Sequence, residues 1–95
     1  MFENIKNNIQ ADWDRFQTAK SAYSQHAFNG NISAVECAEK IADAERVFCD
    51  TIQGYVNHCI FHKITLSEFL GIFSDWFGYF SVDESLWDDA TGLIK

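Results

Sequence analysis

Apolar residues recur along the first third of the chain at alternating steps of three and four positions. The series is Phe2, Ile5, Ile9, Trp13, Phe16, Ala19, Tyr23 and Ala27. Such a spacing places all of these side chains on one side of an α-helix. Asn29-Gly30-Asn31 follows, and Gly30 suits the left-handed position after a helix end. The pattern predicts one long amphipathic helix before residue 29.

Three later segments begin with the same capping signal, a hydroxyl residue followed three positions on by glutamate. The pairs are Ser33 with Glu36, Thr65 with Glu68, and Ser81 with Glu84. In a capping box the hydroxyl accepts a hydrogen bond from the backbone N–H three residues on, and the carboxylate reaches back to the start. These signals predict three further helices, over about residues 34–61, 66–80 and 83–94.

The apolar positions of these three segments define the expected core. They are Ala38, Ile41, Phe48, Ile52, Tyr55 and Cys59, then Phe69, Phe73, Phe77 and Phe80, then Leu86, Ala90 and Leu93. A chain of 95 residues has room for one such core. We therefore expect an all-α fold in which residues 1–95 form one domain, a compact antiparallel bundle of about four helices, two long and two shorter.

The charge of the chain restricts its partners. It has 14 acidic and 7 basic residues, a net charge of −7. Phosphate binding depends on Lys and Arg, so we expect no direct contact with nucleic acid. Glu68 and Asp75 interrupt the longest apolar stretch, which excludes a membrane span. Three cysteines and no secretory segment at the N-terminus indicate a reducing compartment, the cytoplasm of a bacterial or infected host cell.

His58, Cys59 and His62 are the strongest candidates for chemistry. Two histidines four positions apart on a helix can share a zinc or copper ion, but a structural zinc site needs two more ligands. The remaining candidates, His26, Cys37 and Cys49, lack a ligand-like spacing to this pair. A Cys59 nucleophile would need an orienting third group and an oxyanion site, and nothing in the chain marks either. We expect no metal, no cofactor and no enzymatic activity, with a metal-responsive domain as the alternative.

Acidic and aromatic residues gather in the last third of the chain. Between Lys63 and Lys95 there are six acidic residues and no Lys or Arg. Aromatic side chains supply anchoring energy in interfaces, and complementary charge steers the encounter. The predicted partner-binding residues are Asp83, Glu84, Asp88 and Asp89, then Glu36, Glu39 and Asp43, with Trp87, Trp76 and Tyr79 as anchors. The alternative for the three aromatic residues is a place in the core.

Two functions follow from this pattern. The first is a small protein that binds and inhibits a larger basic protein or complex, one that handles nucleic acid, with carboxylates in place of phosphates. In size, charge and lack of a catalytic constellation the chain resembles, in type, phage-encoded anti-CRISPR and anti-restriction inhibitors and the immunity proteins of nuclease toxins. The alternative is a structural or regulatory module that forms a homodimer through aromatic residues outside the monomer core. The pattern leaves open whether the chain is a monomer or a homodimer.

Overall fold

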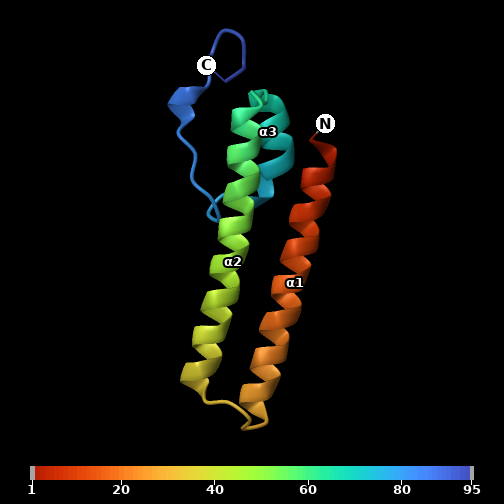
Figure 1. The fold of residues 1–95 in the computed structure, drawn as a ribbon, viewed down its shortest axis with the longest axis vertical. Coiled ribbons are helices and arrows are strands. Elements are labelled where there is room, and N and C mark those ends of the chain that lie inside the picture. Colours follow the sequence, from red (N-terminus) through yellow and green to blue (C-terminus); the bar gives the residue numbers. More distant parts are fainter. Residues whose placement is uncertain (1, 95) are drawn as a thin grey trace.

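Two long helices form an antiparallel hairpin, and a short third helix packs beside them at one end (Figure 1). The computed structural model describes residues 2–94. In it α1 spans Glu3–Phe28, α2 spans Ala34–Phe61 and α3 spans Leu66–Phe73. Two single 3₁₀ turns follow, η1 at Ser74–Trp76 and η2 at Glu84–Leu86. The all-helical class is confirmed, but residues 2–94 contain three α-helices, so the bundle of about four is not.

The starts of α2 and α3 follow from their capping residues. Ser33 Oγ accepts a hydrogen bond from the Glu36 backbone N–H at 3.0 Å. Thr65 Oγ1 accepts one from the Glu68 N–H at 3.1 Å and donates to the Glu68 carboxylate at 3.0 Å. Two of the three predicted helix starts are thus confirmed. The loop between α1 and α2 turns at Gly30, whose φ of 78° is the left-handed conformation that the sequence predicted there.

The core lies at the end of the hairpin that α3 covers. Its buried residues are Ile5, Ile9, Phe16, Phe48, Ile52, Val56, Cys59, Ile64, Phe69, Ile72, Phe73, Trp87 and Ile94. Where α1, α2 and η1 meet, the ring of Trp13 lies 5.3 Å from both Phe48 and Trp76, centroid to centroid. The Trp13–Phe48 contact is edge-to-face, and aromatic pairs of this kind add stability beyond that of area burial alone. Aromatic packing therefore fixes how the third element sits on the hairpin.

The half of the hairpin next to the interhelical loop has no third helix against it (Figure 1). Apart from Cys37, which is buried, its inward residues are mostly half-buried; they include Ala19, Tyr23, Ala27 and Ile41. Ala38, which the sequence placed in the core, is exposed. The molecule is accordingly long and narrow, 57 × 23 × 17 Å, where a compact bundle was expected. No helix in the described range has both the length and the apolar character needed to cross a membrane.

The third helix ends earlier than its apolar pattern predicted. It continues past Phe73 only as the turn η1, and Phe77 then takes an extended ψ of 129°. Gly78 has a φ of 107°, which redirects the chain. This break turns the Phe77 side chain outward, 56 % exposed, although the helical spacing placed it in the core. The prediction that Phe77 is buried was wrong because it assumed an unbroken helix to Phe80.

Residues 83–94 do not form the predicted fourth helix. Asp83 Oδ1 accepts hydrogen bonds from the backbone N–H and the hydroxyl of Ser85, at 3.0 and 2.7 Å, so Asp83 closes a tight local turn. An antiparallel bridge between Trp87 and Ile94 closes the segment on itself, and a second one between Thr65 and Leu93 joins it to the residue that caps α3. The side chains expected to face inward are largely exposed instead; they are Leu86, Ala90 and Leu93.

Candidate protein-binding site

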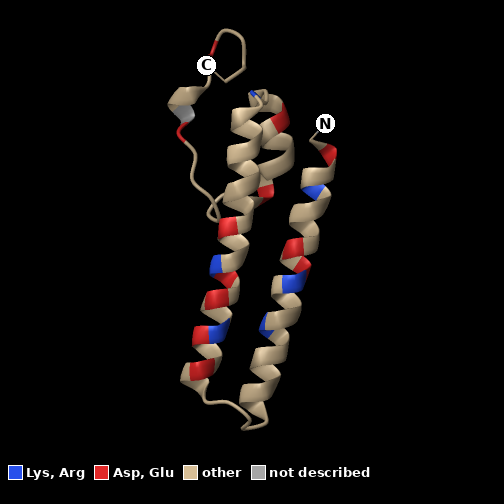
Figure 2. Cartoon of the chain, in the orientation of Figure 1, with Lys and Arg blue, Asp and Glu red and all other residues tan. Residues whose placement is uncertain are grey.

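An acidic face runs along the half of α2 nearer the interhelical loop (Figure 2). Its members, here called the α2 acidic strip, are Glu36, Glu39, Asp43 and Asp50, and all four are exposed. They lie on the side of α2 opposite the buried stripe that includes Phe48 and Ile52. Arg46 lies 3.5 Å from Asp43 and offsets part of this charge. The predicted residues Glu36, Glu39 and Asp43 therefore share one surface.

The charge density of the α2 acidic strip is lower than that of a nucleic acid. Its first and last members, Glu36 and Asp50, are separated by about 21 Å along the helix axis at 1.5 Å per residue. One strand of B-DNA carries about six phosphates over that length, against four carboxylates in the strip. The strip can contact a cluster of Lys and Arg, but it does not reproduce the full charge of a phosphate backbone.

The predicted acidic set near the C-terminus is divided between turn formation and surface. Hydrogen bonds from Ser85 hold the pKa of the exposed Asp83 carboxyl below its usual value. Asp88 is half-buried, and its Oδ1 accepts a hydrogen bond from the Ala90 N–H at 2.8 Å. Asp89 is exposed, and the Glu84 side chain lies outside the described part of the structure. Asp83 and Asp88 therefore organise the backbone around them as well as adding charge.

The three predicted aromatic anchors all contribute to packing. Trp87 is only 6 % exposed, and its ring centroid lies 5.0 Å from that of Phe69. Trp76 and Tyr79 are half-buried against the ring of Trp13. None of the three offers a whole ring to a partner. Trp87 lies in the core, which was the alternative to a role as an interface anchor.

A groove opens where α3 meets the C-terminal segment, and this C-terminal groove brings exposed apolar residues together. It has a volume of about 340 Å³ and is lined by Leu66, Phe69, Leu70, Phe77, Val82, Trp87 and Asp89. Leu66 and Leu70 stand one turn apart on the outer face of α3. The sequence analysis placed Phe77 in the core and so missed this groove. The sequence signal that could have predicted the groove was the wide apolar face of α3, which is too wide for a single packing partner to cover.

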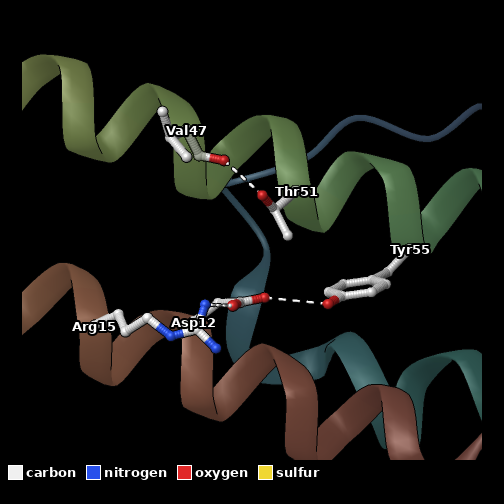
Figure 3. Close-up of polar contacts among 5 residues, drawn as sticks. All are labelled: Asp12, Arg15, Val47, Thr51 and Tyr55. Carbon is white, nitrogen blue, oxygen red and sulfur yellow. Dashed lines mark hydrogen bonds and ion pairs between the residues drawn. The ribbon is translucent and has the colours of Figure 1, made fainter.

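A second groove follows the α1–α2 interface and contains the main polar contact between these helices (Figure 3). This hairpin groove, of about 260 Å³, includes Phe16, Ala19, Val47 and Phe48 in its lining. Sequence analysis missed this contact because Asp12 directly precedes the core residue Trp13 and belongs to no recognised motif.

The polar contact itself joins three side chains. Tyr55 on α2 donates a hydrogen bond to Asp12 Oδ2 at 3.2 Å, and Arg15 lies 2.7 Å from Asp12 Oδ1. Burial and the Asp12 carboxylate raise the pKa of Tyr55. With an ion pair on one oxygen and a hydroxyl on the other, Asp12 is held as a structural carboxylate.

The candidates for metal and nucleophilic chemistry are not assembled into a site. The rings of His58 and His62 lie 4.4 Å apart on the exposed side of α2. Cys59 is fully buried, and burial raises the pKa of its thiol to about 11, with a further contribution from Glu68. Among the described residues no three His, Cys, Asp or Glu side chains group closely enough to hold a metal ion. Cys59 accordingly serves as a small core residue in its neutral form.

Comparison with known proteins gives no family assignment. No protein-family model, curated protein or solved structure matches this chain.

Proposed function

We propose that this chain is a small acidic protein without enzymatic activity, and that it binds and inhibits a larger basic protein that handles nucleic acid. The observation that supports this most is the α2 acidic strip. Its four carboxylates are exposed on the helix face opposite the core, where they satisfy no packing requirement. A Lys and Arg cluster that normally holds phosphates is the complementary surface.

Charged and apolar contacts contribute to the proposed interface in different ways. A solvent-exposed ion pair contributes only about 0–1 kcal/mol, so the strip alone supplies encounter rate and selectivity more than affinity. Tight binding requires buried apolar anchors near the centre of an interface. In this molecule the C-terminal groove offers exposed Leu66, Leu70 and Phe77 for that purpose. The proposed interface therefore combines the acidic strip with an apolar site.

The burial and hydrogen bonding of the reactive side chains support a binding role over catalysis. The Cys59 thiol is buried and its pKa is raised, which opposes formation of a nucleophilic thiolate. Asp12 is committed to Arg15 and Tyr55. Asp83 and Asp88 close backbone turns. No side chain among these is both accessible and paired with a group that would activate it.

The test is affinity capture from bacterial lysate with the tagged chain, at low and high salt, followed by mass spectrometry. We expect a basic nucleic-acid-handling protein that is retained at low salt and released at high salt. The variant Glu36→Lys/Glu39→Lys/Asp43→Lys should retain much less of it, because the reversed charges repel Lys and Arg of the partner. Its control, Asp14→Lys/Glu45→Lys/Asp75→Lys, makes the same change of net charge, from −7 to −1, elsewhere on the surface. Equal capture by the two variants would refute a role for the strip.

A homodimeric module is the second candidate, and the uncovered half of the hairpin favours it. Val47 beside the hairpin groove is 61 % exposed, and no third helix covers Ala19 or Ala44. A second copy packed there would complete a four-helix arrangement. Sedimentation equilibrium at micromolar concentration tests this candidate. A stable dimer that Val47→Glu dissociates favours it, and a monomer removes it.

A further inference from the structure

We propose that the C-terminal groove is the docking site for a partner segment that presents a large apolar side chain flanked by Lys or Arg. This inference rests on the proposed function, because it assigns a place and a chemistry to the contact with the basic partner. It also makes a claim of its own, that apolar contact in this groove, more than the α2 acidic strip, determines the affinity.

The apolar part of the argument is the concentration of incompletely buried large side chains on one side of α3. Leu66, Leu70 and Phe77 are 40, 42 and 56 % exposed, and all three line the same groove. The buried rings of Phe69 and Trp87 lie beneath them. Isolated exposed leucines are common in proteins, but a contiguous group around a hollow is typical of an interaction site.

The charge around the groove determines the kind of occupant. Residues 64–94, which form the whole groove, include no Lys or Arg. They include six acidic residues, of which Glu68 lies on the other side of α3, beside α1. Asp89 lines the groove itself. Lys or Arg beside the anchor of a partner would be attracted to this region, and an acidic partner segment would be repelled. Charge complementarity therefore favours a basic amphipathic segment over a second copy of this acidic chain.

The groove is shaped before any partner arrives. The Leu66 backbone N–H donates to the Gly92 carbonyl at 2.8 Å, which fastens the C-terminal segment to the start of α3. On the α2 side, Gln53 receives a hydrogen bond from the Ser81 N–H at 2.8 Å and donates one to the Ser81 carbonyl at 3.0 Å. A groove held by backbone contacts on both sides has little ordering entropy left to lose on binding.

Trp87 adds a polar feature to this apolar site. Its indole Nε1 is buried and has no hydrogen-bond acceptor among the described atoms, which leave out the Glu84 side chain. A buried donor without a partner is costly, and a nearby acceptor recovers that cost. Because this nitrogen has almost no accessible surface, a backbone carbonyl of a docked segment reaches it only if the Trp87 ring moves within the groove lining.

The probe is a fluorescein-labelled synthetic helix of Leu, Phe and Lys, about 14 residues or four turns long. One control peptide has every Lys replaced by Glu, and a second has every Leu and Phe replaced by Ser. Fluorescence anisotropy measures affinity for the full chain, and amide chemical shifts locate the site. We expect the parent peptide to bind at the groove, with each control at least about tenfold weaker.

Variants of the chain separate groove contact from general charge attraction. Leu70→Ser and Phe77→Ser should each weaken the parent peptide by about tenfold or more, because they remove exposed anchoring surface without emptying the core. Phe61→Ser and Val47→Ser are matched controls, since both residues are more exposed than Phe77 and neither lines the groove. These controls should stay within about twofold of the parent chain. Circular dichroism confirms that each variant is folded.

Several results would overturn the inference. Equal binding of the Ser-substituted peptide would show attraction by charge alone, and equal losses in the Phe61 and Val47 variants would show that the groove is not special. Self-association abolished by Phe77→Ser would make a second copy the occupant. Capture of a basic protein that the groove variants retain would refute this inference and leave the proposed function standing. Peptide binding at the groove without any captured basic protein would support the groove as a docking site and count against the proposed function.

Discussion

The hydroxyl of Tyr55 on α2 donates a hydrogen bond to Oδ2 of Asp12 on α1, 43 positions earlier in the sequence (Figure 3). This contact fixes the relative height of the two long helices at the level where α3 begins to cover them. Arg15 neutralises the same carboxylate, so a half-buried charge is tolerated at the helix interface.

Tyr55→Phe removes only the hydroxyl and leaves the ring in place. We expect it to lower the free energy of unfolding by about 1.5 kcal/mol, because one hydrogen bond contributes about 1 kcal/mol net and a charged acceptor raises that value. Urea denaturation followed by circular dichroism measures the change. Tyr23→Phe is the control, because Tyr23 is also half-buried on the hairpin and makes no such bond to a carboxylate. Equal losses in both variants would contradict this role of Tyr55.

Cys59 makes stability depend on pH on the alkaline side. Its pKa rises from 9.0 to about 11 on folding, so the neutral thiol is favoured in the folded state. The stabilisation is fully present below pH 9 and is lost as pH rises through 11, a fall on the order of 2–3 kcal/mol. Between pH 8.5 and 10.5 the free energy of unfolding should fall less steeply with pH in Cys59→Ala than in its parent chain. Both chains carry Tyr55→Phe, because the raised pKa of Tyr55 changes stability in the same direction. Parallel slopes would contradict the assignment.

Ser33 and Thr65 cap helices, whereas Ser81 has the same sequence signal and caps none, so the three residues can be compared directly. Ser33→Ala and Thr65→Ala should each cost about 1 kcal/mol, because each leaves a helix N-terminal N–H without its acceptor. Ser81→Ala should be close to neutral, since Ser81 is held through its backbone by Gln53. Thermal denaturation compares the three variants. A cost for Ser81→Ala equal to the other two would mean that a capped helix forms there after all.

The sequence was most predictive for those elements in which the local residue pattern and the tertiary packing agree. The ends of α2 were predicted correctly because Ser33 caps its start and an apolar stripe continues to Cys59. The last third could not be predicted in the same way. Ser81 and Glu84 have the spacing of a capping box, but Asp83 bonds to Ser85 and closes a competing turn.

The candidate site was predicted only in part, for the same physical reason. An exposed strip on one long helix follows from periodicity, so Glu36, Glu39 and Asp43 were placed together correctly. A groove between α3 and a segment that crosses back to it depends on long-range closure, here the bridge between Thr65 at the start of α3 and Leu93. Helical periodicity does not describe such a closure. It placed Phe77 in the core, which was wrong, and left Trp87 open between an interface anchor and the core.

Substitutions at Trp87 and Phe77 test the observed burial of the first ring and exposure of the second. Trp87→Ala empties a buried site against Phe69 and should cost about 3–5 kcal/mol. Phe77→Ala removes a ring that is more than half exposed and should cost about 1 kcal/mol or less. Trp87→Phe should fall between them, because it keeps an aromatic ring and removes the unpaired indole N–H. Chemical denaturation of all three ranks them, and a larger loss for Phe77→Ala would contradict the described C-terminal fold.

The most direct test of the central claim is competition between this chain and nucleic acid for the captured basic protein. A labelled oligonucleotide is bound to that protein, the chain is titrated in, and the fluorescence anisotropy of the oligonucleotide is followed. We expect the wild-type chain to displace the oligonucleotide, and Glu36→Lys/Glu39→Lys/Asp43→Lys to do so far less well than its matched control. A ternary complex, in which chain and oligonucleotide remain bound together at saturating concentrations of both, would contradict inhibition by occupation of the phosphate-binding surface.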